Sequence, residues 1–454
     1  MRKILIIGAG KSASYLIKYL LNKSEEENLL IIVGDINFPN AKKLIGDHEN
    51  AQAIILDVFN KQSREQAIQN ADIVVSMLPA RFHIEVAKDC IRFNKNMVTA
   101  SYVSDEMQNL DRAAKEKGLI FMNEIGVDPG VDHMSAMHLI DKVRDKGGDI
   151  ILFESFTGGL VAPESDNNLW NYKFTWNPRN VVVAGQGGAA KFLQEGTYKY
   201  IPYNRLFRRT EFLDVEGYGR FEGYANRDSL KYQSAYGLDH VKTLYRGTIR
   251  RVGFSRAWNM FVQLGMTDDS YTIDDSENMS YRDFVNAFLA YSPTDSVELK
   301  FRHALKIDQD DIVWDKLMEL DLFSSKKMVE LKRATPAQVL QKILEDSWTL
   351  QDHEKDMIVM YHKLGYELDG KKYQIDSTMV TVGEDKVYTA MSKTVGLPVA
   401  IATLAILNEK IVTPGVQIPI TKEVYEPILK ELESYDIVFT ETKVPYLGYN
   451  PLNL

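Results

Sequence analysis

The amino-acid sequence predicts a doubly wound α/β domain, followed by a part of α+β type. Short aliphatic runs recur along roughly the first 125 residues, and stretches with helical spacing of apolar residues separate them. Continuous Val, Ile and Leu strands divided by helices are typical of a parallel sheet that helices cover on both faces. The expected strands are Ile4–Ile7, Leu29–Val33, Ala53–Leu56, Ile73–Met77, Met97–Thr99 and Leu119–Phe121. The expected helices begin near Lys11, Pro39, Lys61, Phe82 and Asp105.

The residue composition and pattern change at about Ile150. Aromatic and Gly-rich pieces with strand character follow, and strands segregated from helices indicate an α+β domain with an antiparallel or mixed sheet. These pieces are Ile150–Phe156, Gly217–Tyr224 and Thr243–Gly253. The segment 268–378 is acidic, and we expect it to be largely helical. An apolar helix is expected over Met391–Asn408, and a last helix over roughly Tyr425–Ser434.

Composition narrows the class of protein. The chain has 454 residues, of which 45% are hydrophobic and 26% charged, so it is too long for one hydrophobic core. The net charge of -9 predicts no nucleic-acid or membrane partner, which leaves a small molecule. No stretch approaches the roughly 18 apolar residues of a membrane span, and we expect a cytoplasmic protein. The single Cys90 excludes an internal disulfide framework and is interpreted as buried packing. The eight scattered histidines predict no metal site.

A dinucleotide motif follows the first strand directly. Gly8-Ala9-Gly10-Lys11-Ser12-Ala13 fits the pattern G-x-G-x-x-A and opens a helix, which predicts a Rossmann βαβ unit. Gly8 would permit the tight turn, Gly10 would admit the pyrophosphate, and Ala13 would let helix and strand pack closely. A glycine turn without a cofactor is the alternative. It is disfavoured because the turn, the helix and Asp35 all have the spacing of a dinucleotide-binding unit.

Asp35 bears on the choice of cofactor. It ends the second strand, where an acid can bind the adenosine ribose hydroxyls and would repel a 2′-phosphate. The next residue is Ile36 rather than the arginine that NADP enzymes often use. The sequence therefore favours NAD, with NADP possible.

Two further strand ends are candidates for cofactor contacts. Asp57 and Val58 follow the third strand and could border the adenine, although a simple turn role is equally open for Asp57. Leu78 follows the fourth strand, in Ser76-Met77-Leu78-Pro79. Ligands of such folds lie beyond the carboxyl ends of the strands.

Longer motifs carry a resemblance to a known family. The sequence resembles the glutamate-forming saccharopine dehydrogenases, also called saccharopine reductases, nearly from end to end. The motifs are Ala100-Ser101-Tyr102, Asn123-Glu124-Ile125-Gly126-Val127-Asp128-Pro129-Gly130-Val131-Asp132-His133, Ser155-Phe156-Thr157-Gly158-Gly159-Leu160-Val161-Ala162-Pro163, Tyr172-Lys173-Phe174-Thr175-Trp176, Asn226-Arg227-Asp228-Ser229, Arg246-Gly247-Thr248 and Thr394-Val395-Gly396-Leu397-Pro398.

The resemblance implies the domain plan and the activity. Residues 1–128 and about 392–454 would form the Rossmann domain, and about 129–391 an inserted substrate and dimerisation domain of a homodimer. The implied reaction of lysine metabolism is the reversible, NAD(P)-dependent conversion of saccharopine and water to glutamate and 2-aminoadipate 6-semialdehyde. The family's basic residue after the second strand is Ile36 here, which again supports NAD. A related opine or carboxyspermidine-type dehydrogenase, or an NAD-binding regulator without activity, is the alternative.

The resemblance also implies site residues. Arg227 and Arg250 are suited to bind substrate carboxylates, because a planar guanidinium can bind a carboxylate through two hydrogen bonds. A polyamine substrate would need acidic partners instead, so both arginines favour saccharopine. The remaining expected substrate contacts are Ser101, Tyr102, Thr248 and Ile249. Helix capping and ring packing are the alternative roles of Ser101 and Tyr102.

Cofactor contacts and proton transfer are expected around Asp128. The family places cofactor contacts at Val127, Asp128, Pro129 and Trp176. The Asp128 carboxylate could favour the protonated amine or take a proton from water, or it could simply brace a Pro-Gly turn. His133 is a second candidate acid or base, because the ordinary pKa of histidine, about 6.5, suits proton transfer.

Overall fold

The structure is a computed structural model that describes residues 1–448. The chain divides into two compact units. Unit 1 comprises Met1–Asp149 and Met379–Thr440, and unit 2 comprises Ile150–Thr378 with residues 441–448. The last six residues of the expected Rossmann domain, 449–454, lie outside the described part.

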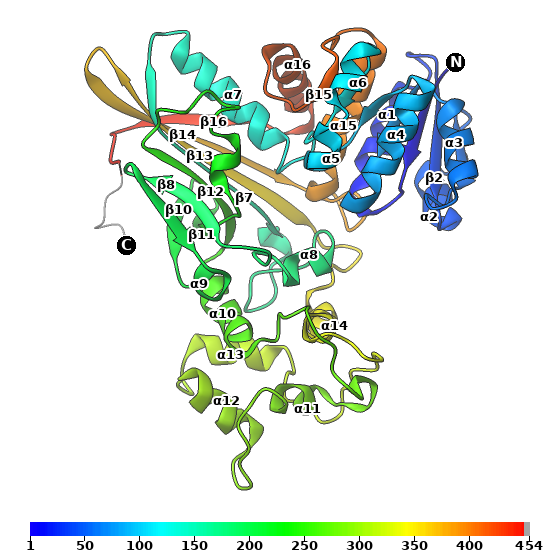
Figure 1. Ribbon diagram of the computed structural model, residues 1–454. Coiled ribbons are helices and arrows are strands. Elements are labelled where there is room, and N and C mark those ends of the chain that lie inside the picture. The colour runs from blue at the N-terminus through cyan, green and yellow to red at the C-terminus, as the bar shows by residue number, and fades with distance from the viewer. Residues whose placement is uncertain (449–454) are drawn as a thin grey trace. The chain divides into compact units, whose positions relative to one another are not determined.

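Unit 1, which begins with the blue part of the chain in Figure 1, is built on a seven-stranded sheet. The strand order is β15-β6-β5-β4-β1-β2-β3. Every strand pair in this sheet is parallel. Its first six strands thus have the Rossmann order 3-2-1-4-5-6, whose direction of winding reverses between β1 and β4. The strands are β1 (Arg2–Ile7), β2 (Leu29–Asp35), β3 (Ala51–Ile55), β4 (Ile73–Ser76), β5 (Asn96–Val98), β6 (Ile120–Met122) and β15 (Gly415–Gln417).

Helices cover both faces of this sheet, as the alternating pattern predicts. They are α1 (Ser14–Lys23), α2 (Phe38–Ile45), α3 (Lys61–Gln69), α4 (His83–Phe93), α5 (Asp105–Gln108), α6 (Asp111–Glu116), α7 (Val131–Arg144), α15 (Ala390–Leu407) and α16 (Lys422–Leu432), with 3-10 turns at Lys11–Ala13 and Ala80–Phe82. Cys90 on α4 is fully buried in the core between helices and sheet. This position confirms that Cys90 is a packing residue, and the same burial raises the pKa of its thiol.

Helix α15 is the one element with the length and composition of a membrane span among residues 1–448. The sequence analysis missed this property, but 83% of the helix is buried inside the protein. It packs on α1. A Cβ atom on Gly396 would lie 2.7 Å from the backbone nitrogen of Leu16, so only glycine permits this approach. The apolar character of α15 therefore serves the core of unit 1.

The boundaries of the units differ from those expected at 128 and about 392. Helix α7 belongs to unit 1 because it packs against α16. The Tyr425 hydroxyl donates to the Asp141 carboxylate at 2.7 Å, and Lys422 forms an ion pair with Asp145 at 3.0 Å. The sequence carries no local signal for contacts between helices so far apart in the chain.

Unit 2 contains a mixed sheet, which confirms the α+β prediction. Strand β12 pairs parallel with β7 and antiparallel with β11. The order is β10-β11-β12-β7-β13-β14-β16, and the hairpin β8-β9 attaches to β12. The strands are β7 (Asp149–Val161), β8 (Ala190–Gln194), β9 (Thr197–Ile201), β10 (Thr210–Val215), β11 (Gly219–Ala225), β12 (Thr243–Arg251), β13 (Asp356–Leu368), β14 (Lys371–Val382) and β16 (Thr440–Val444).

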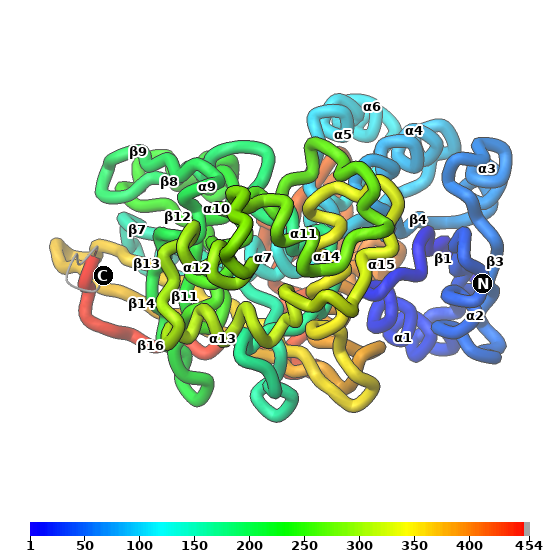
Figure 2. The backbone as a smooth tube through the Cα atoms, turned by 90° about the horizontal axis from the view of Figure 1, so that it is seen from below, coloured from blue at the N-terminus to red at the C-terminus, as the bar shows by residue number. Residues whose placement is uncertain are grey.

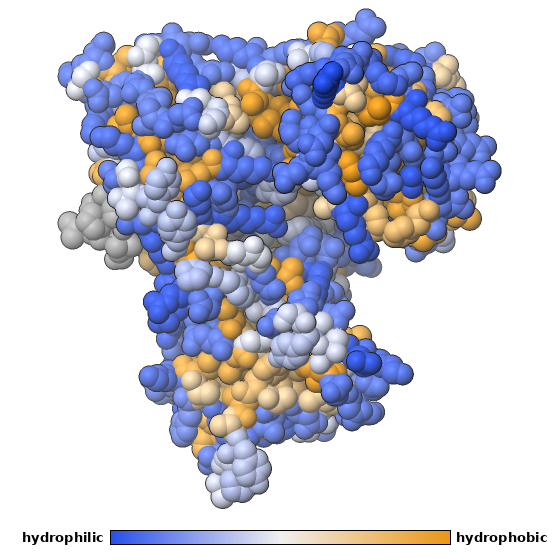
Figure 3. All heavy atoms as spheres, in the orientation of Figure 1, coloured by the Kyte–Doolittle hydropathy of each residue, from blue (hydrophilic) through white to orange (hydrophobic). Residues whose placement is uncertain are grey.

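The expected helical segment 268–378 is helical only as far as Trp348. Strands β13 and β14 follow, joined by the two-residue turn Asp369-Gly370, where both residues have positive φ angles. An Asp-Gly pair between two apolar runs is a strong hairpin signal, which the charge-based interpretation overlooked. The helices of unit 2 are α8 (Pro178–Val182), α9 (Tyr203–Leu206), α10 (Phe254–Leu264), α11 (Tyr281–Asn286), α12 (Val297–Leu305), α13 (Ile312–Glu319) and α14 (Pro336–Trp348). Helices α11 to α14 lie together in Figures 1 and 2, and apolar side chains gather on their surface in Figure 3.

Candidate functional site

The glycine turn after β1 has the geometry that a dinucleotide requires. Gly8 has a φ of +108°, and a Cβ atom there would lie 2.8 Å from the Met77 carbonyl oxygen. A Cβ atom on Gly10 would meet nothing within 4 Å, so the space in front of this residue is open. Ala13 is buried, and α1 begins directly after it. The turn therefore leaves room for a pyrophosphate at the start of a helix, where backbone amides favour anions.

Asp35 lies beside this turn, as its position at the end of β2 predicts. One carboxylate oxygen accepts a hydrogen bond from the Ala9 backbone nitrogen at 2.7 Å, and the other accepts one from Asn37 at 2.7 Å. The next side chain, Ile36, is 71% exposed and adds no positive charge. Lys11 and Ser12 lie at the start of the helix, with Lys11 exposed and Ser12 half-buried. The residues present thus fit a bound dinucleotide.

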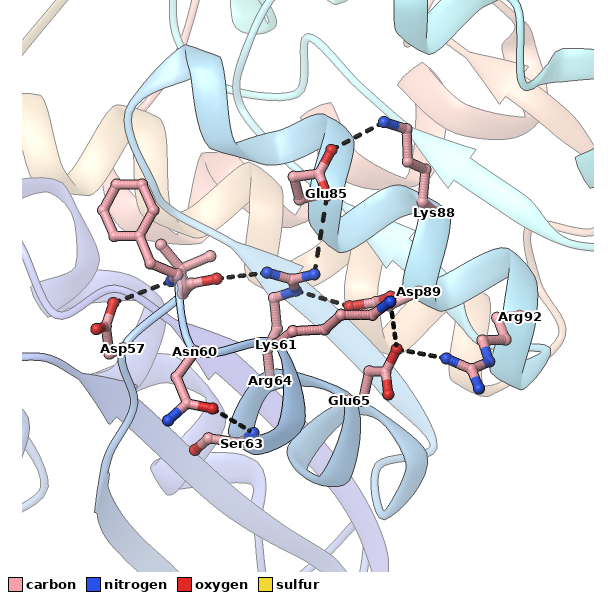
Figure 4. A network of polar contacts seen from close by, with 12 residues as sticks. Asp57, Asn60, Lys61, Ser63, Arg64, Glu65, Glu85, Lys88, Asp89 and Arg92 are labelled. Carbon is pink, nitrogen blue, oxygen red and sulfur yellow. Dashed lines mark hydrogen bonds and ion pairs between the residues drawn. The ribbon is translucent and has the colours of Figure 1, made fainter.

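The turn that follows β3 is held by a buried arginine (Figure 4). Asp57 accepts a hydrogen bond from the Phe59 backbone nitrogen at 2.9 Å, so its carboxylate closes the turn. Arg64 on α3 donates to the Val58 carbonyl, and its Nε atom lies 2.6 Å from an Asp89 carboxylate oxygen on α4. The side chains of Arg64 and Asp89 are only 6% and 8% exposed. Asp57 therefore has the turn role that was one of its two expected roles. Its contact with the adenine stays a prediction.

His83 is a residue of the β4 edge that sequence reasoning missed. Its Nδ1 atom lies 2.8 Å from the Ser76 hydroxyl, and its Nε2 atom is buried without a partner among the described residues. Burial lowers the pKa of His83 to about 4, and a backbone hydrogen bond with Leu78 opposes this shift. The imidazole is therefore neutral at pH 7. It fixes the loop that carries Leu78 at the point where the winding of the sheet reverses.

The lowered pKa of His83 predicts that the free energy of unfolding depends on pH. The unfolded chain binds a proton on this residue below about pH 6.5, whereas the folded chain resists protonation down to about pH 4. The free energy of unfolding should therefore fall as the pH falls through this window, by at most about 1.4 kcal/mol per pH unit from this group. Urea unfolding of the wild type and His83→Gln between pH 7 and pH 4.5 would measure it. Identical slopes would contradict the prediction.

Glu124 connects the expected substrate turn with His133. It follows β6 and has a φ of +53°. Its backbone nitrogen donates to the Ser101 carbonyl at 3.0 Å. Its carboxylate accepts from the Val103 backbone nitrogen at 2.9 Å and lies 3.0 Å from the Nε2 atom of His133. Glu124 therefore fixes the turn that carries Ser101 and Tyr102, both of which are half-buried.

His133 is fully buried against Glu124. This environment differs from that of an accessible acid or base, because the imidazole is occupied in holding a carboxylate. Sequence reasoning quoted Glu124 within a motif but gave it no role. A glutamate at the carboxyl end of a strand, nine residues before a histidine on the following helix, was the available signal.

Asp128 lies in a closed loop between β6 and α7. The Gly126 backbone nitrogen donates to the Pro129 carbonyl at 2.9 Å, and the Gly130 nitrogen donates to the Asp132 carboxylate at 2.6 Å. The Asp128-Pro129 peptide bond is cis. Within this loop Val127 and Pro129 are buried, whereas Asp128 is only half-buried. Asp128 is thus the carboxylate of this loop that keeps access to a ligand.

The expected contacts of unit 2 lie on β12 and in nearby loops. Thr248 and Arg250 share one face of the strand, and Ile249 points to the other because side chains alternate. A Cβ atom on Gly158 would lie 2.5 Å from the Ile249 carbonyl oxygen, so β7 and β12 approach closely there. Ile249 could contact a ligand on the Thr248 face only through its backbone. Trp176 is half-buried, in the segment before α8.

The two expected clamp arginines have different surroundings. Arg227 is exposed in the loop after β11, with a φ of +49°, and its carbonyl accepts from Lys191 at 2.8 Å. Arg250 is only 5% exposed, and its guanidinium lies over the rings of Tyr172 and Phe254 at 5.0 and 5.4 Å. No carboxylate pairs with Arg250 in residues 1–448, and its Nε atom is unpartnered. Arg250 is therefore a buried cation in an aromatic cluster, unlike an open clamp.

Comparison with known proteins covers both units. The model of the saccharopine dehydrogenase NADP binding domain matches residues 4–122, and that of the saccharopine dehydrogenase C-terminal domain matches residues 126–438. The chain belongs to the saccharopine dehydrogenase family. It is 33% identical to saccharopine dehydrogenase [NADP(+), L-glutamate-forming] of Schizosaccharomyces pombe, over 97% of this chain and 99% of that protein. It is 31% identical to mouse mitochondrial alpha-aminoadipic semialdehyde synthase, over 96% of this chain but 47% of that protein.

A solved structure of the family agrees with the fold. The apo histidine-tagged saccharopine dehydrogenase (L-Glu forming) from Saccharomyces cerevisiae matches with a TM-score of 0.88 at 31% identity, over 98% of this chain and all of that one. The resemblance seen in the sequence motifs and the predicted fold class are thereby confirmed. In the part of the chain that the structure describes, no group of three or more His, Cys, Asp or Glu side chains could hold a metal ion.

Proposed function

We propose that the chain catalyses the reversible NAD(P)-dependent oxidation of saccharopine, which with the addition of water gives glutamate and 2-aminoadipate 6-semialdehyde. The observation that carries the proposal is the 33% identity to the fission-yeast enzyme across nearly the whole of both chains. The open turn at Gly10 supports it, because the turn provides the cofactor site that such a reaction needs. The bound nicotinamide would accept the hydride. The hydride would leave the CH₂ carbon beside the secondary amine, because this carbon becomes the aldehyde of the product.

The protein's own groups would bind the substrate and move protons. We assign proton transfer for the addition of water to Asp128, the half-buried carboxylate of the loop between β6 and α7. His133 and Glu124 would position the Ser101-Tyr102 turn, because His133 is wholly buried against Glu124. Arg227 would bind a substrate carboxylate. Thr248, the Ile249 backbone and the Arg250 charge would complete the substrate contacts on β12, and Trp176 would contact the cofactor.

NAD is the proposed preferred cofactor, although the curated yeast relatives carry NADP(+) in their names. The reason is local: Asp35 presents a carboxylate beside the turn, and Ile36 supplies no cation for a 2′-phosphate. We also predict a homodimer and a cytoplasmic location. Sedimentation of the purified protein would test the homodimer.

One assay tests both proposals. Purified protein with saccharopine should increase the absorbance of reduced cofactor, and kcat/KM should be higher with NAD⁺ than with NADP⁺. Asp35→Ser with Ile36→Arg should shift this ratio toward NADP⁺. No absorbance increase with either cofactor would refute the activity. A strong NADP⁺ preference in the wild type would refute only the cofactor choice. A carboxyspermidine-type substrate that reacts when saccharopine does not would favour the alternative function.

Replacing Arg227 by alanine should raise the KM for saccharopine about 10- to 100-fold, because a charge-assisted hydrogen bond contributes about 1.5–3 kcal/mol. The change in kcat should be smaller, since this group contacts a carboxylate remote from the reacting carbon. Steady-state kinetics at saturating cofactor would measure both. Arg208→Ala, which removes another exposed arginine, is the control. An unchanged KM in Arg227→Ala would assign Arg227 a structural role.

Replacing Asp128 by asparagine should lower kcat about 100-fold, the smaller end of what general acid or base catalysis contributes. The amide keeps the shape of the side chain but cannot take a proton. Fluorescence titration with reduced cofactor should show that the dissociation constant changes little. A kcat within a factor of three of the wild type would remove Asp128 from the proton transfer.

A further inference from the structure

A pocket in unit 1 contains none of the residues assigned to the reaction. It is lined by α1, by the start of α15 and by the turn after α16, and has a volume of about 190 Å³. Its lining residues are Tyr15, Lys18, Tyr19, Asn22, Glu384, Lys393, Leu397, Ser434, Tyr435 and Asp436. A water molecule occupies about 30 Å³, so this space exceeds one water. It is smaller than the roughly 300 Å³ at which drug-sized sites begin.

Lys393 gives the pocket a buried cation. Its side chain is on the first turn of α15, and the residue is 7% exposed. The ammonium donates to the Thr381 hydroxyl at 3.1 Å and forms no ion pair within residues 1–448. An ammonium has three donors, so two remain for other partners. Burial lowers the pKa of Lys393, whereas Asp436 and Glu384 oppose this shift. A buried charge that lacks a counterion is costly, and an anionic ligand group would relieve this cost.

Asp436 gives the same pocket an anion. It follows the turn after α16, with a φ of +59°, and is exposed. Its carboxylate accepts no hydrogen bond and forms no ion pair in the described part of the chain. Lys393 and Asp436 therefore face one space as opposite charges that are not paired with each other.

The other charges on the wall are already matched. Lys18 pairs with Glu384 at 3.2 Å, and the Tyr15 hydroxyl donates to Glu384 at 2.6 Å. The Tyr19 hydroxyl donates to Glu431. Three tyrosine rings and Leu397 supply apolar surface between these groups. Only Lys393 and Asp436 are therefore left to select a ligand by charge.

We propose that this pocket binds a free α-amino acid, with its carboxylate on Lys393 and its ammonium on Asp436. The zwitterion carries one group of each sign on one carbon, which matches the two unpaired charges. The side chain would lie on the tyrosine rings and Leu397. The pocket volume suits a molecule of this size and excludes a dinucleotide. Ser14 on α1 bonds to Ser392 on α15 at 2.8 Å, so the pocket and the glycine turn share the same helix pair.

Isothermal titration calorimetry of the full chain with L-leucine, L-lysine and L-glutamate tests the proposal. At least one should bind saturably. For that amino acid, the analogues lacking only the amine or only the carboxylate should bind at least tenfold more weakly. For L-leucine these analogues are 4-methylpentanoate and 3-methylbutylamine. Binding by none of the three amino acids, or equal binding by the analogues, would overturn the proposal.

Two variants locate the binding. Asp436→Asn and Lys393→Gln should each weaken binding at least tenfold, whereas Glu433→Gln, a nearby exposed acid outside the pocket, should not change it. Asp436 is exposed, so its variant tests the site even if Lys393→Gln fails to fold. For L-leucine and L-lysine, which are not products of the proposed reaction, Arg227→Ala should leave the binding unchanged, and this separates the pocket from the substrate site. Unchanged binding in Asp436→Asn would overturn the assignment.

Discussion

Replacing Gly10 by valine should abolish dinucleotide binding while leaving the fold intact. A Cβ atom on Gly10 meets no protein atom within 4 Å, so the larger side chain enters open space and costs little stability. That space is where the pyrophosphate must approach the backbone amides at the start of α1. A hydrogen bond to a charged group contributes about 1.5–3 kcal/mol, so losing two of those between the pyrophosphate and the backbone amides should raise the dissociation constant for NADH at least about 100-fold.

The measurement pairs NADH fluorescence titration with thermal unfolding of the free protein. Gly8→Ala is the matched comparison, because the two glycines differ in what surrounds them. A Cβ atom on Gly8 lies 2.8 Å from the Met77 carbonyl oxygen at a φ of +108°, so this variant should lose stability as well as binding. If Gly10→Val bound NADH as tightly as the wild type, the turn would not be the pyrophosphate site.

The Rossmann half of the fold was predictable because its signals are local. Each strand is a short apolar run, and the glycine motif, the α1 helix and Asp35 all lie within 35 residues of Met1. Parallel strands bring their carboxyl ends to one edge of the sheet. The predicted strand ends were therefore enough to place Asp35, Asp57 and Leu78 at that edge. The hairpin of β13 and β14 was missed for a different reason. The charges of the preceding helices dominated the pattern, and the Asp369-Gly370 turn was not weighed.

The residues that sequence reasoning missed act through contacts that no local pattern records. Glu124 bonds to the Ser101 carbonyl, the Val103 nitrogen and His133, which come from two separate parts of the chain. The sequence also does not state that His133 is fully buried beside Glu124 or that Arg250 lies among aromatic rings. Such residues become visible only when the elements that surround them are placed.

Replacing Asp89 by alanine should strongly destabilise unit 1. The Asp89 carboxylate lies 2.6 Å from Arg64 Nε, and both side chains are almost fully buried. Removing it would leave a buried guanidinium whose next carboxylate, Glu85, is 3.9 Å away and 48% exposed. Breaking a buried ion pair on one side typically costs about 3–5 kcal/mol. For a unit of this size, the unfolding temperature should fall by about 10 °C.

Glu65→Ala is the control for this prediction, because Glu65 pairs with the exposed Arg92 in the same network (Figure 4). Exposed pairs contribute at most about 1 kcal/mol, so its unfolding temperature should change little. The double variant Arg64→Met with Asp89→Leu separates the charge from the packing. It should recover much of the lost stability, since apolar residues of similar size can replace a buried ion pair. It should also weaken NADH binding, because the Val58 carbonyl would lose its Arg64 donor and the turn after β3 would loosen. Equal stability of Asp89→Ala and Glu65→Ala would show that the buried pair contributes no more than a surface one.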